Sequence, residues 1–85
     1  DMNIVMWTKD DCSFCRRAKS LLTSYDLTFE ERKIGDGYTR EQFFESNPGQ
    51  TTLPQIYIYN KHVGGYTELV EYIETTGFNG TGSSL

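Results

Sequence analysis

The sequence predicts an α/β fold with the element order βαβαββα. Three observations support it: a β-branched, apolar stretch near the N-terminus, segments with helical spacing of apolar residues, and a hairpin pattern in the second half. A chain of 85 residues has room for one modest core. We therefore expect one domain over residues 1–78. The remaining residues, 79–85, have almost nothing to bury and are expected to form a flexible C-terminal tail.

The first predicted element is a strand over residues 3–8, which is rich in β-branched, aromatic and long apolar side chains. Alternation places Ile4 and Met6 on one face and Val5 and Trp7 on the other. A strand with apolar side chains on both faces is typical of the middle of a sheet. We therefore expect this strand to be central.

A helix is predicted next, over residues 13–25, followed by a strand over residues 27–34 and a turn at residues 35–37. The apolar side of the helix is expected to carry Phe14, Ala18, Leu21, Leu22 and Tyr25. Strand, helix and strand within about thirty residues form a βαβ unit, whose crossover is right-handed.

A second helix is predicted to start at Thr39, because Thr39 and Gln42 have the spacing of a capping box. It should end at residues 47–49, Asn-Pro-Gly. A strand over residues 53–59 and a short strand at residues 62–63 then form an antiparallel hairpin.

A last helix is predicted to run from an N-cap at Thr67 through residue 75, with Gly77 as the residue that ends it. The chain thus has three helices and four strands in the predicted order.

The formal net charge of −4 argues against nucleic acid as a partner, since binding to phosphates requires clustered lysines and arginines. The N-terminal stretch has no basic segment, and its apolar run is too short for a signal peptide or a membrane span. We therefore expect a cytoplasmic protein without a membrane segment. In that compartment, ordinary thiols stay reduced.

Two cysteines three residues apart, Cys12 and Cys15, form the candidate catalytic site. A cysteine is a nucleophile as its thiolate, which the positive end of a helix stabilises. Cys12 stands at the start of the first predicted helix, and Cys15 follows one turn later on the same side. This placement predicts that Cys12 attacks a disulfide and that Cys15 resolves the product.

Other interpretations of the cysteine pair are a structural zinc site, a structural disulfide and two inert core thiols. Zinc normally takes four ligands, and beyond the cysteines the chain offers His62 and carboxylates. A disulfide across so short a loop constrains the unfolded chain little. A redox pair between a strand and a helix is therefore favoured.

Three motifs, in this order, resemble those of dithiol glutaredoxins. They are Thr8-Lys9-x-x-Cys12-x-x-Cys15, Thr52-Leu53-Pro54 and Gly64-Gly65-Tyr66-Thr67-Glu68. The resemblance covers roughly residues 3–76. It implies a thioredoxin-like fold, in which a four-stranded mixed sheet is flanked by three helices. It also implies a cis peptide before Pro54, where the residues alone favour trans.

The same resemblance implies a glutathione-dependent reductase of glutathione mixed disulfides and protein disulfides. Glutathione is then the co-substrate, and the partners are glutathionylated or disulfide-containing proteins, with ribonucleotide reductase as a candidate. The protein is expected to be a monomer. The glutathione-binding residues implied are Lys9, Phe14, Leu53, Pro54, Gly65, Tyr66, Thr67 and Glu68.

Individual roles follow from the resemblance. The backbone of Leu53 is expected to pair with glutathione like an added strand. The helix start near Thr67 should receive the γ-glutamyl carboxylate, and Glu68 should meet the ammonium group. Lys9 is the first candidate for the glycyl carboxylate, ahead of Gln50 and Arg40.

Ser13 and Phe14 depart from the pattern, since most dithiol members have proline and tyrosine there. Some members without that proline are similar to iron–sulfur carriers. One alternative is therefore a dimer that holds a [2Fe–2S] cluster through Cys12 of each chain and two glutathiones; no other metal is expected. A second alternative is a thioredoxin-like donor reduced by a flavoprotein reductase, although Asp11 replaces the tryptophan of thioredoxins.

Overall fold

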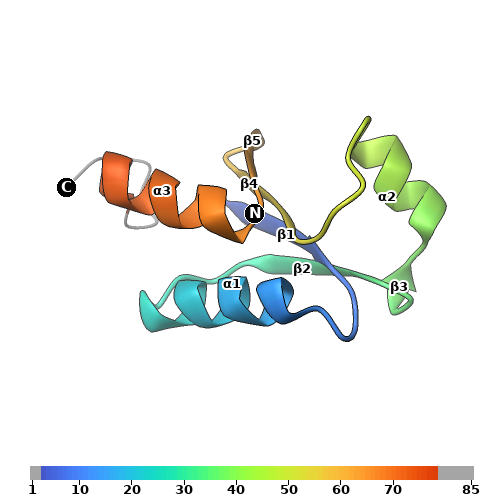
Figure 1. Cartoon of the computed structure of the whole chain (residues 1–85), viewed down its shortest axis with the longest axis horizontal. Helices are drawn as coiled ribbons and strands as arrows, with labels where there is room; N and C mark the ends of the chain where they lie inside the picture. The colour runs from blue at the N-terminus through green and yellow to red at the C-terminus, as the bar shows by residue number, and fades with distance from the viewer. Residues whose placement is uncertain (1–2, 79–85) are drawn as a thin grey trace.

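The computed structural model describes residues 3–78, which form five strands and three helices (Figure 1). In chain order these are β1 Ile4–Thr8, α1 Ser13–Ser24, β2 Glu30–Ile34, β3 Gly37–Tyr38, α2 Arg40–Ser46, β4 Gln55–Ile58, β5 Lys61–Gly64 and α3 Tyr66–Thr76. The tail predicted over residues 79–85 lies outside the described residues.

The strands form one mixed sheet in the order β3-β2-β1-β4-β5, so β1 is central as predicted. β1 pairs in parallel with β2, with α1 as the crossover between them, and antiparallel with β4. β4 and β5 form the predicted antiparallel hairpin. The α/β fold class and the mixed sheet are therefore confirmed.

The two faces of β1 pack against different helices, as the alternation predicted. Ile4 and Met6 belong to the buried cluster that contains Ala18 and Leu22 of α1 and the inward side chains of α3. On the other face, the ring of Trp7 contacts the ring of Phe43 in α2. Helices therefore cover both faces of the central strand, which explains why its side chains at residues 4–7 are apolar.

The prediction of four strands was one strand short. β3 is a two-residue strand that pairs with the end of β2 after the turn at residues 35–37. The backbone N–H of Gly35 donates to the carbonyl of Tyr38 at 2.8 Å, which closes this turn. Two residues are too few to show any alternation, so the sequence could not indicate this strand.

Other element limits also differ from the prediction. β2 begins at Glu30 rather than at residue 27, because the chain turns at Asp26, whose φ is 58°. Phe14 and Tyr25, predicted on the buried side of the first helix, are half exposed. The last helix begins at Tyr66 with Gly65 as N-cap, two residues before the predicted N-cap.

The predicted start of α2 and the predicted end of α3 are confirmed. Gln42 N–H donates to Thr39 Oγ1 at 3.1 Å, and Thr39 N–H donates to Gln42 Oε1 at 2.7 Å, which completes the capping box. α3 ends at Gly77, which has a left-handed backbone with a φ of 65°.

A polar network ties the end of β1 to β2 and α1. The buried hydroxyl of Thr8 donates to Glu31 Oε2 at 2.6 Å, and Lys19 Nζ lies 2.8 Å from the same oxygen. Burial acts to raise the pKa of Glu31, but the hydrogen bonds from Lys19 and Thr8 hold this pKa below its ordinary value. The network fixes the point where β1 passes into the loop before Cys12.

We predict that Glu31 stabilises the fold only while it is ionised. A folded-state pKa below the ordinary value of 4.5 gives a contribution that is present above that value and is lost as the pH falls through the lowered pKa. The difference in the free energy of unfolding between the wild type and Glu31→Gln should therefore be constant near neutral pH and shrink in acid. Urea denaturation at several pH values measures it.

Glu45→Gln is the matched control, because Glu45 is exposed on α2 and forms no ion pair within residues 3–78. A Glu31→Gln difference that stays the same down to pH 3 contradicts the prediction.

Candidate active site

Cys12 and Cys15 form a disulfide at the start of α1. Cys12 is the N-cap, with an extended backbone, and the N–H of Cys15 donates to Cys12 Sγ at 3.2 Å. The preceding residue, Asp11, turns the loop with a φ of 55°. The sulfur of Cys12 thus takes the place that a serine or aspartate oxygen takes in an ordinary N-cap.

The two sulfurs differ in access and in their electrostatic surroundings. Cys12 retains 9% of its surface exposed and Cys15 only 1%. Once the disulfide is reduced, Cys12 Sγ lies at the positive end of α1, and the first turn of that helix has no acidic residue. These features favour the thiolate at Cys12 over the thiolate at Cys15.

Asp10, two residues before Cys12, is paired away from the site. Its carboxylate lies 2.7 Å from Lys33 Nζ at the end of β2. The hydrogen bond and the charge of Lys33 hold the pKa of Asp10 below its ordinary value, and Asp10 raises the pKa of Lys33 in return. The positive charge of Lys33 offsets the negative charge that Asp10 brings close to the sulfurs.

The Leu53–Pro54 peptide faces the cysteine pair and is cis, as the resemblance implied. The carbonyl oxygen of Leu53 lies 3.7 Å from Cys12 Sγ. A substrate disulfide that reaches Cys12 must therefore lie against the backbone of Leu53.

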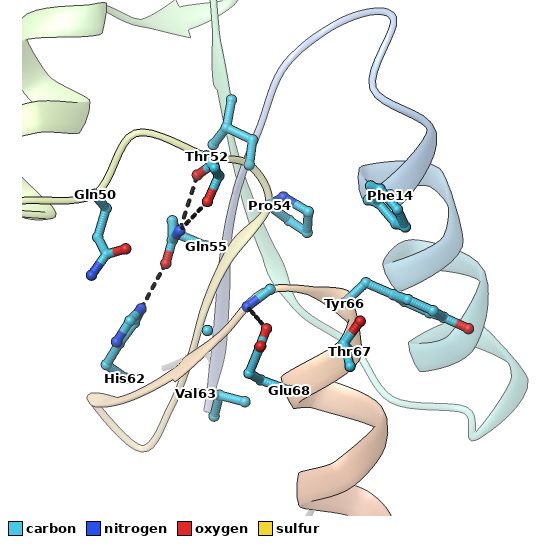
Figure 2. Close-up of a pocket in the computed structure, with 13 residues that line it drawn as sticks. Phe14, Gln50, Thr52, Pro54, Gln55, His62, Val63, Tyr66, Thr67 and Glu68 are labelled. Carbon is cyan, nitrogen blue, oxygen red and sulfur yellow. Dashed lines mark hydrogen bonds between the residues drawn. The ribbon is translucent and has the colours of Figure 1, made fainter.

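The buried side-chain amide of Gln55 forms hydrogen bonds that hold the loop before Pro54 in place (Figure 2). Gln55 Nε2 donates to the carbonyl and to the hydroxyl of Thr52, at 3.0 and 3.2 Å. His62 Nε2 lies 2.6 Å from Gln55 Oε1. The amide nitrogen of Gln55 faces Thr52, and an amide oxygen can only accept, so His62 Nε2 is the donor in this hydrogen bond. The network joins β5 to the residue before Leu53.

A second contact anchors the other end of the same loop. The hydroxyl of Tyr57 donates to Asn47 Oδ1 at 2.7 Å, and Asn47 Nδ2 donates to the carbonyl of Phe43 at 2.8 Å. Burial raises the pKa of Tyr57, so this hydroxyl stays protonated. β4 is thereby fixed to the C-terminal end of α2.

A cleft of about 530 Å³ opens beside the loop and contains most of the predicted glutathione-binding residues. The predicted residues that line it are Phe14, Leu53, Pro54, Gly65, Tyr66, Thr67 and Glu68. Figure 2 shows Phe14 from α1 and Tyr66 from α3 side by side. Their rings stack with centroids 6.3 Å apart and form one end of the cleft.

Lys9, the remaining predicted residue, lies in a neighbouring hollow of about 120 Å³. This hollow also contains Arg40, one of the two weaker candidates for the same role, and the rings of Phe43 and Phe44, whereas Gln50 lines the larger cleft. Leu53 lines both spaces. The two hollows therefore meet at the residue whose backbone faces Cys12.

Glu68 combines a structural contact with its place in the cleft. Its Oε1 accepts the N–H of Gly65 at 2.9 Å. Since Gly65 has no side chain, the first N–H groups of α3 lack a side-chain acceptor. A Cβ at Gly64 would lie 3.0 Å from the side chain of Glu68, and the φ of Gly64 is 122°, so both space and backbone require glycine there.

Among the polar residues that line the cleft, Thr52, Gln55 and His62 had no predicted ligand-binding role. Gln55 and His62 fall within the two predicted strands of the hairpin, over residues 53–59 and 62–63. A polar residue directly after Pro54, in a strand that is otherwise apolar, was the available signal for Gln55. No pattern in the sequence pairs His62 with it, because that contact depends on the hairpin register.

Comparison with known proteins agrees with this geometry. The glutaredoxin family model matches residues 4–63, more than half of the chain. The chain belongs to the glutaredoxin family. It is 41% identical over 68 residues to glutaredoxin 3 of Escherichia coli K12, which covers 79% of this chain and 81% of that protein. It is 35% identical over 68 residues to glutaredoxin 1 of Rickettsia prowazekii, with 78% and 72% covered.

Solved structures of the family have the same fold. This glutaredoxin superimposes on the solution structure of glutaredoxin from Brucella melitensis with a TM-score of 0.75, at 29% identity, over 99% of this chain and 95% of that one. Family membership makes the protein a thiol–disulfide oxidoreductase, and the disulfide of Cys12 and Cys15 is its redox-active group. Within residues 3–78, no helix is long and apolar enough to cross a membrane.

We predict that Gln55 keeps Leu53 in position. Gln55→Leu removes the donor to Thr52 and the acceptor of His62, which should cost about 0.5–1.5 kcal/mol of stability for each hydrogen bond lost. It should also lower kcat/KM for disulfide reduction by about tenfold, since small displacements of a positioning element are costly. Urea denaturation and steady-state kinetics measure the two effects.

Tyr57→Phe is the matched control. It removes the hydrogen bond to Asn47, at a cost of about 1 kcal/mol, but leaves the contacts of Gln55 intact. If both variants lose activity in proportion to their stability, Gln55 has no separate positioning role.

Proposed function

We propose that this glutaredoxin is a glutathione-dependent reductase of glutathione mixed disulfides and protein disulfides. The observation that carries the proposal is the pair of hollows that meet at Leu53, directly beside Cys12. One hollow includes the start of α3 and the other includes Lys9 and Arg40.

Glutathione carries a carboxylate at each end and its cysteine in the middle. The uncapped N–H groups at Thr67 and Glu68 suit the γ-glutamyl carboxylate. Lys9 and Arg40 suit the glycyl carboxylate. Strand-like pairing with the backbone of Leu53 then brings the central sulfur to Cys12. The Phe14 and Tyr66 rings close the end of the cleft against water.

The first half-reaction is attack by the Cys12 thiolate on the glutathione sulfur of a mixed disulfide. A bond forms between Cys12 Sγ and glutathione, and the former partner leaves as a thiolate that takes a proton from solvent. A second glutathione, as its thiolate, then attacks the bound glutathione sulfur. Oxidised glutathione leaves, and the Cys12 thiolate is restored.

A protein disulfide needs Cys15 as well. Attack by Cys12 leaves a mixed disulfide with the substrate, and the Cys15 thiolate then attacks Cys12 Sγ. The substrate leaves as a dithiol, and the Cys12–Cys15 disulfide forms. Two molecules of glutathione reduce this disulfide and leave as oxidised glutathione. The shielding of Cys15 supports its role as the second nucleophile.

We predict that the two cysteines are not equivalent. Cys12→Ser should abolish turnover of the mixed disulfide of glutathione and 2-mercaptoethanol, because the attacking sulfur is gone. Cys15→Ser should retain most of that turnover, because glutathione itself resolves the intermediate. NADPH oxidation coupled through glutathione reductase measures both variants.

Equal loss in the two variants contradicts these roles. The same assay with thioredoxin reductase in place of glutathione and its reductase tests the thioredoxin-like alternative, and activity with that enzyme alone would favour it. Ser13 keeps the [2Fe–2S] alternative as a hypothesis, in which Cys12 and two glutathiones per dimer hold the cluster. Anaerobic reconstitution that gives neither visible absorbance nor a dimer would exclude it.

We predict that Lys9 recognises the glycyl carboxylate. In the wild type, a mixed disulfide of the glycinamide form of glutathione, in which a neutral amide replaces that carboxylate, should have a KM about fivefold above that of the glutathione mixed disulfide. Lys9→Gln should raise the KM for glutathione and leave little difference between the two substrates. Lys61→Gln, the same charge change on the β4–β5 hairpin, should keep the wild-type difference.

A difference that survives in Lys9→Gln assigns the carboxylate elsewhere, and Arg40→Gln is then the next variant to measure.

We further propose that the protein acts in the cytoplasm as a monomer, with glutathione and glutathionylated or disulfide-containing proteins as its partners. Ribonucleotide reductase is a candidate among these proteins. The negative net charge supports a role without nucleic acid.

A further inference from the structure

A third hollow, of about 580 Å³, lies between the first turns of α1 and the start of α3. It is separate from the proposed glutathione cleft, although Tyr66 lines both. The remaining lining residues are Ser13, Arg16, Arg17, Ser20 and Leu21. Two of these five residues are arginines and two are serines. None of the five has a role in the proposed reaction.

The two arginines stand out against the charge of the whole chain. The protein carries eight lysines and arginines and a net charge of −4. Lys19, Arg32 and Lys33 each pair with a carboxylate. Within residues 3–78, Arg16 and Arg17 form no ion pair, and both are exposed. Their positive charge is thus available to an external anion.

The guanidinium of Arg17 is positioned by contact with an aromatic ring. Its Cζ lies 5.4 Å from the centroid of the Phe14 ring, and Phe14 in turn stacks on Tyr66. Stacking uses the face of a guanidinium and leaves the N–H groups at its edge free for a bidentate contact with a carboxylate. Phe14 can support this contact because half of its surface is exposed.

The location of the hollow indicates which molecule brings the anion. Ser13 directly follows Cys12 in the chain, so the hollow begins at the residue next to the reacting cysteine, on α1. The glutathionyl group of a substrate is proposed to occupy the other cleft. The polypeptide of the substrate protein must then extend away from Cys12 over a part of the surface outside that cleft. The arginine-lined hollow is a neighbouring part of the surface.

We propose that this hollow binds acidic side chains that flank the glutathionylated cysteine of protein substrates. The proposal rests on the proposed function, because it assumes that a glutathionyl group lies in the cleft. It names a substrate class, namely glutathionylated proteins with Asp or Glu near the modified cysteine. The serine hydroxyls of Ser13 and Ser20 add neutral donors to the two arginines.

Two synthetic peptides test the proposal. Both carry one glutathionylated cysteine; in one it is flanked by glutamates, and in the other by lysines at the same positions. The wild type should have a kcat/KM about fivefold higher for the acidic peptide at low salt, and this ratio should fall towards one at high salt. In the double variant Arg16→Gln, Arg17→Gln the ratio should be close to one at all salt concentrations.

The ratio separates binding from chemistry, because any change in the reactivity of Cys12 affects both peptides equally. Lys61→Gln is the matched control, as it removes one positive charge from a different part of the surface and should keep the wild-type ratio. A wild-type ratio near one, an arginine variant that keeps the preference, or an equal loss in Lys61→Gln overturns the proposal.

The small mixed disulfide of glutathione and 2-mercaptoethanol distinguishes this proposal from the proposed function. If the wild type does not reduce it, the proposed function fails. If it reduces the small substrate but treats the two peptides alike, only the role of the hollow fails.

Discussion

The position of Cys12 Sγ, between the start of α1 and the carbonyl of Leu53, is the constraint on which the rest of the structure depends. A thiolate needs hydrogen-bond donors and a positive potential, and the helix start supplies both. A disulfide exchange also needs the substrate sulfur in line with the attacking sulfur, and the loop before Pro54 supplies that surface. Neither the helix start nor the loop is sufficient alone. The fold must therefore hold Cys12 Sγ and the carbonyl oxygen of Leu53 close together, and they lie 3.7 Å apart.

The sheet performs this task through contacts on both sides of the loop. β1 leads into the loop that carries Cys12. The last residue of β1, Thr8, is bonded to β2 by the network around Glu31. β4 delivers Pro54, and Gln55 and Tyr57 connect that strand to Thr52 and to the end of α2. Because β1 and β4 are neighbouring strands, small errors in these contacts add directly to the distance between the sulfur and the loop.

Much of this arrangement could be predicted from local sequence patterns. The alternation of Ile4, Met6 and Trp7 gave the central strand, and Thr39 with Gln42 gave the cap of α2. β3 could not be predicted, since two residues carry no period. Helical spacing placed Phe14 on the apolar side of the helix, because spacing alone does not show that the first turn extends past the core towards the start of α3; the family resemblance, in contrast, predicted that Phe14 meets a ligand.

For the candidate site, the sequence predicted the residues that motifs carry but not those that support them. The cysteines and the residues at the start of α3 stand in short fixed spacings. Gln55 and His62, in contrast, act through a contact across the β4–β5 hairpin, whose register shifts at Ile56 and Tyr57. Such a contact depends on a bulge that no local pattern encodes.

The distribution of charge would help an acidic protein to attract the anionic co-substrate that we propose. Within residues 3–78, the paired cations lie on α1 and β2, where they neutralise carboxylates and hold elements together. Of the five cations without an ion pair there, four lie in the hollows around Cys12: Lys9, Arg16, Arg17 and Arg40. These four cations therefore place positive charge near the loop that carries Cys12, although the net charge of the chain is −4. Such a local potential raises the concentration of anions at the site and favours the thiolate, and both effects weaken as salt screens them.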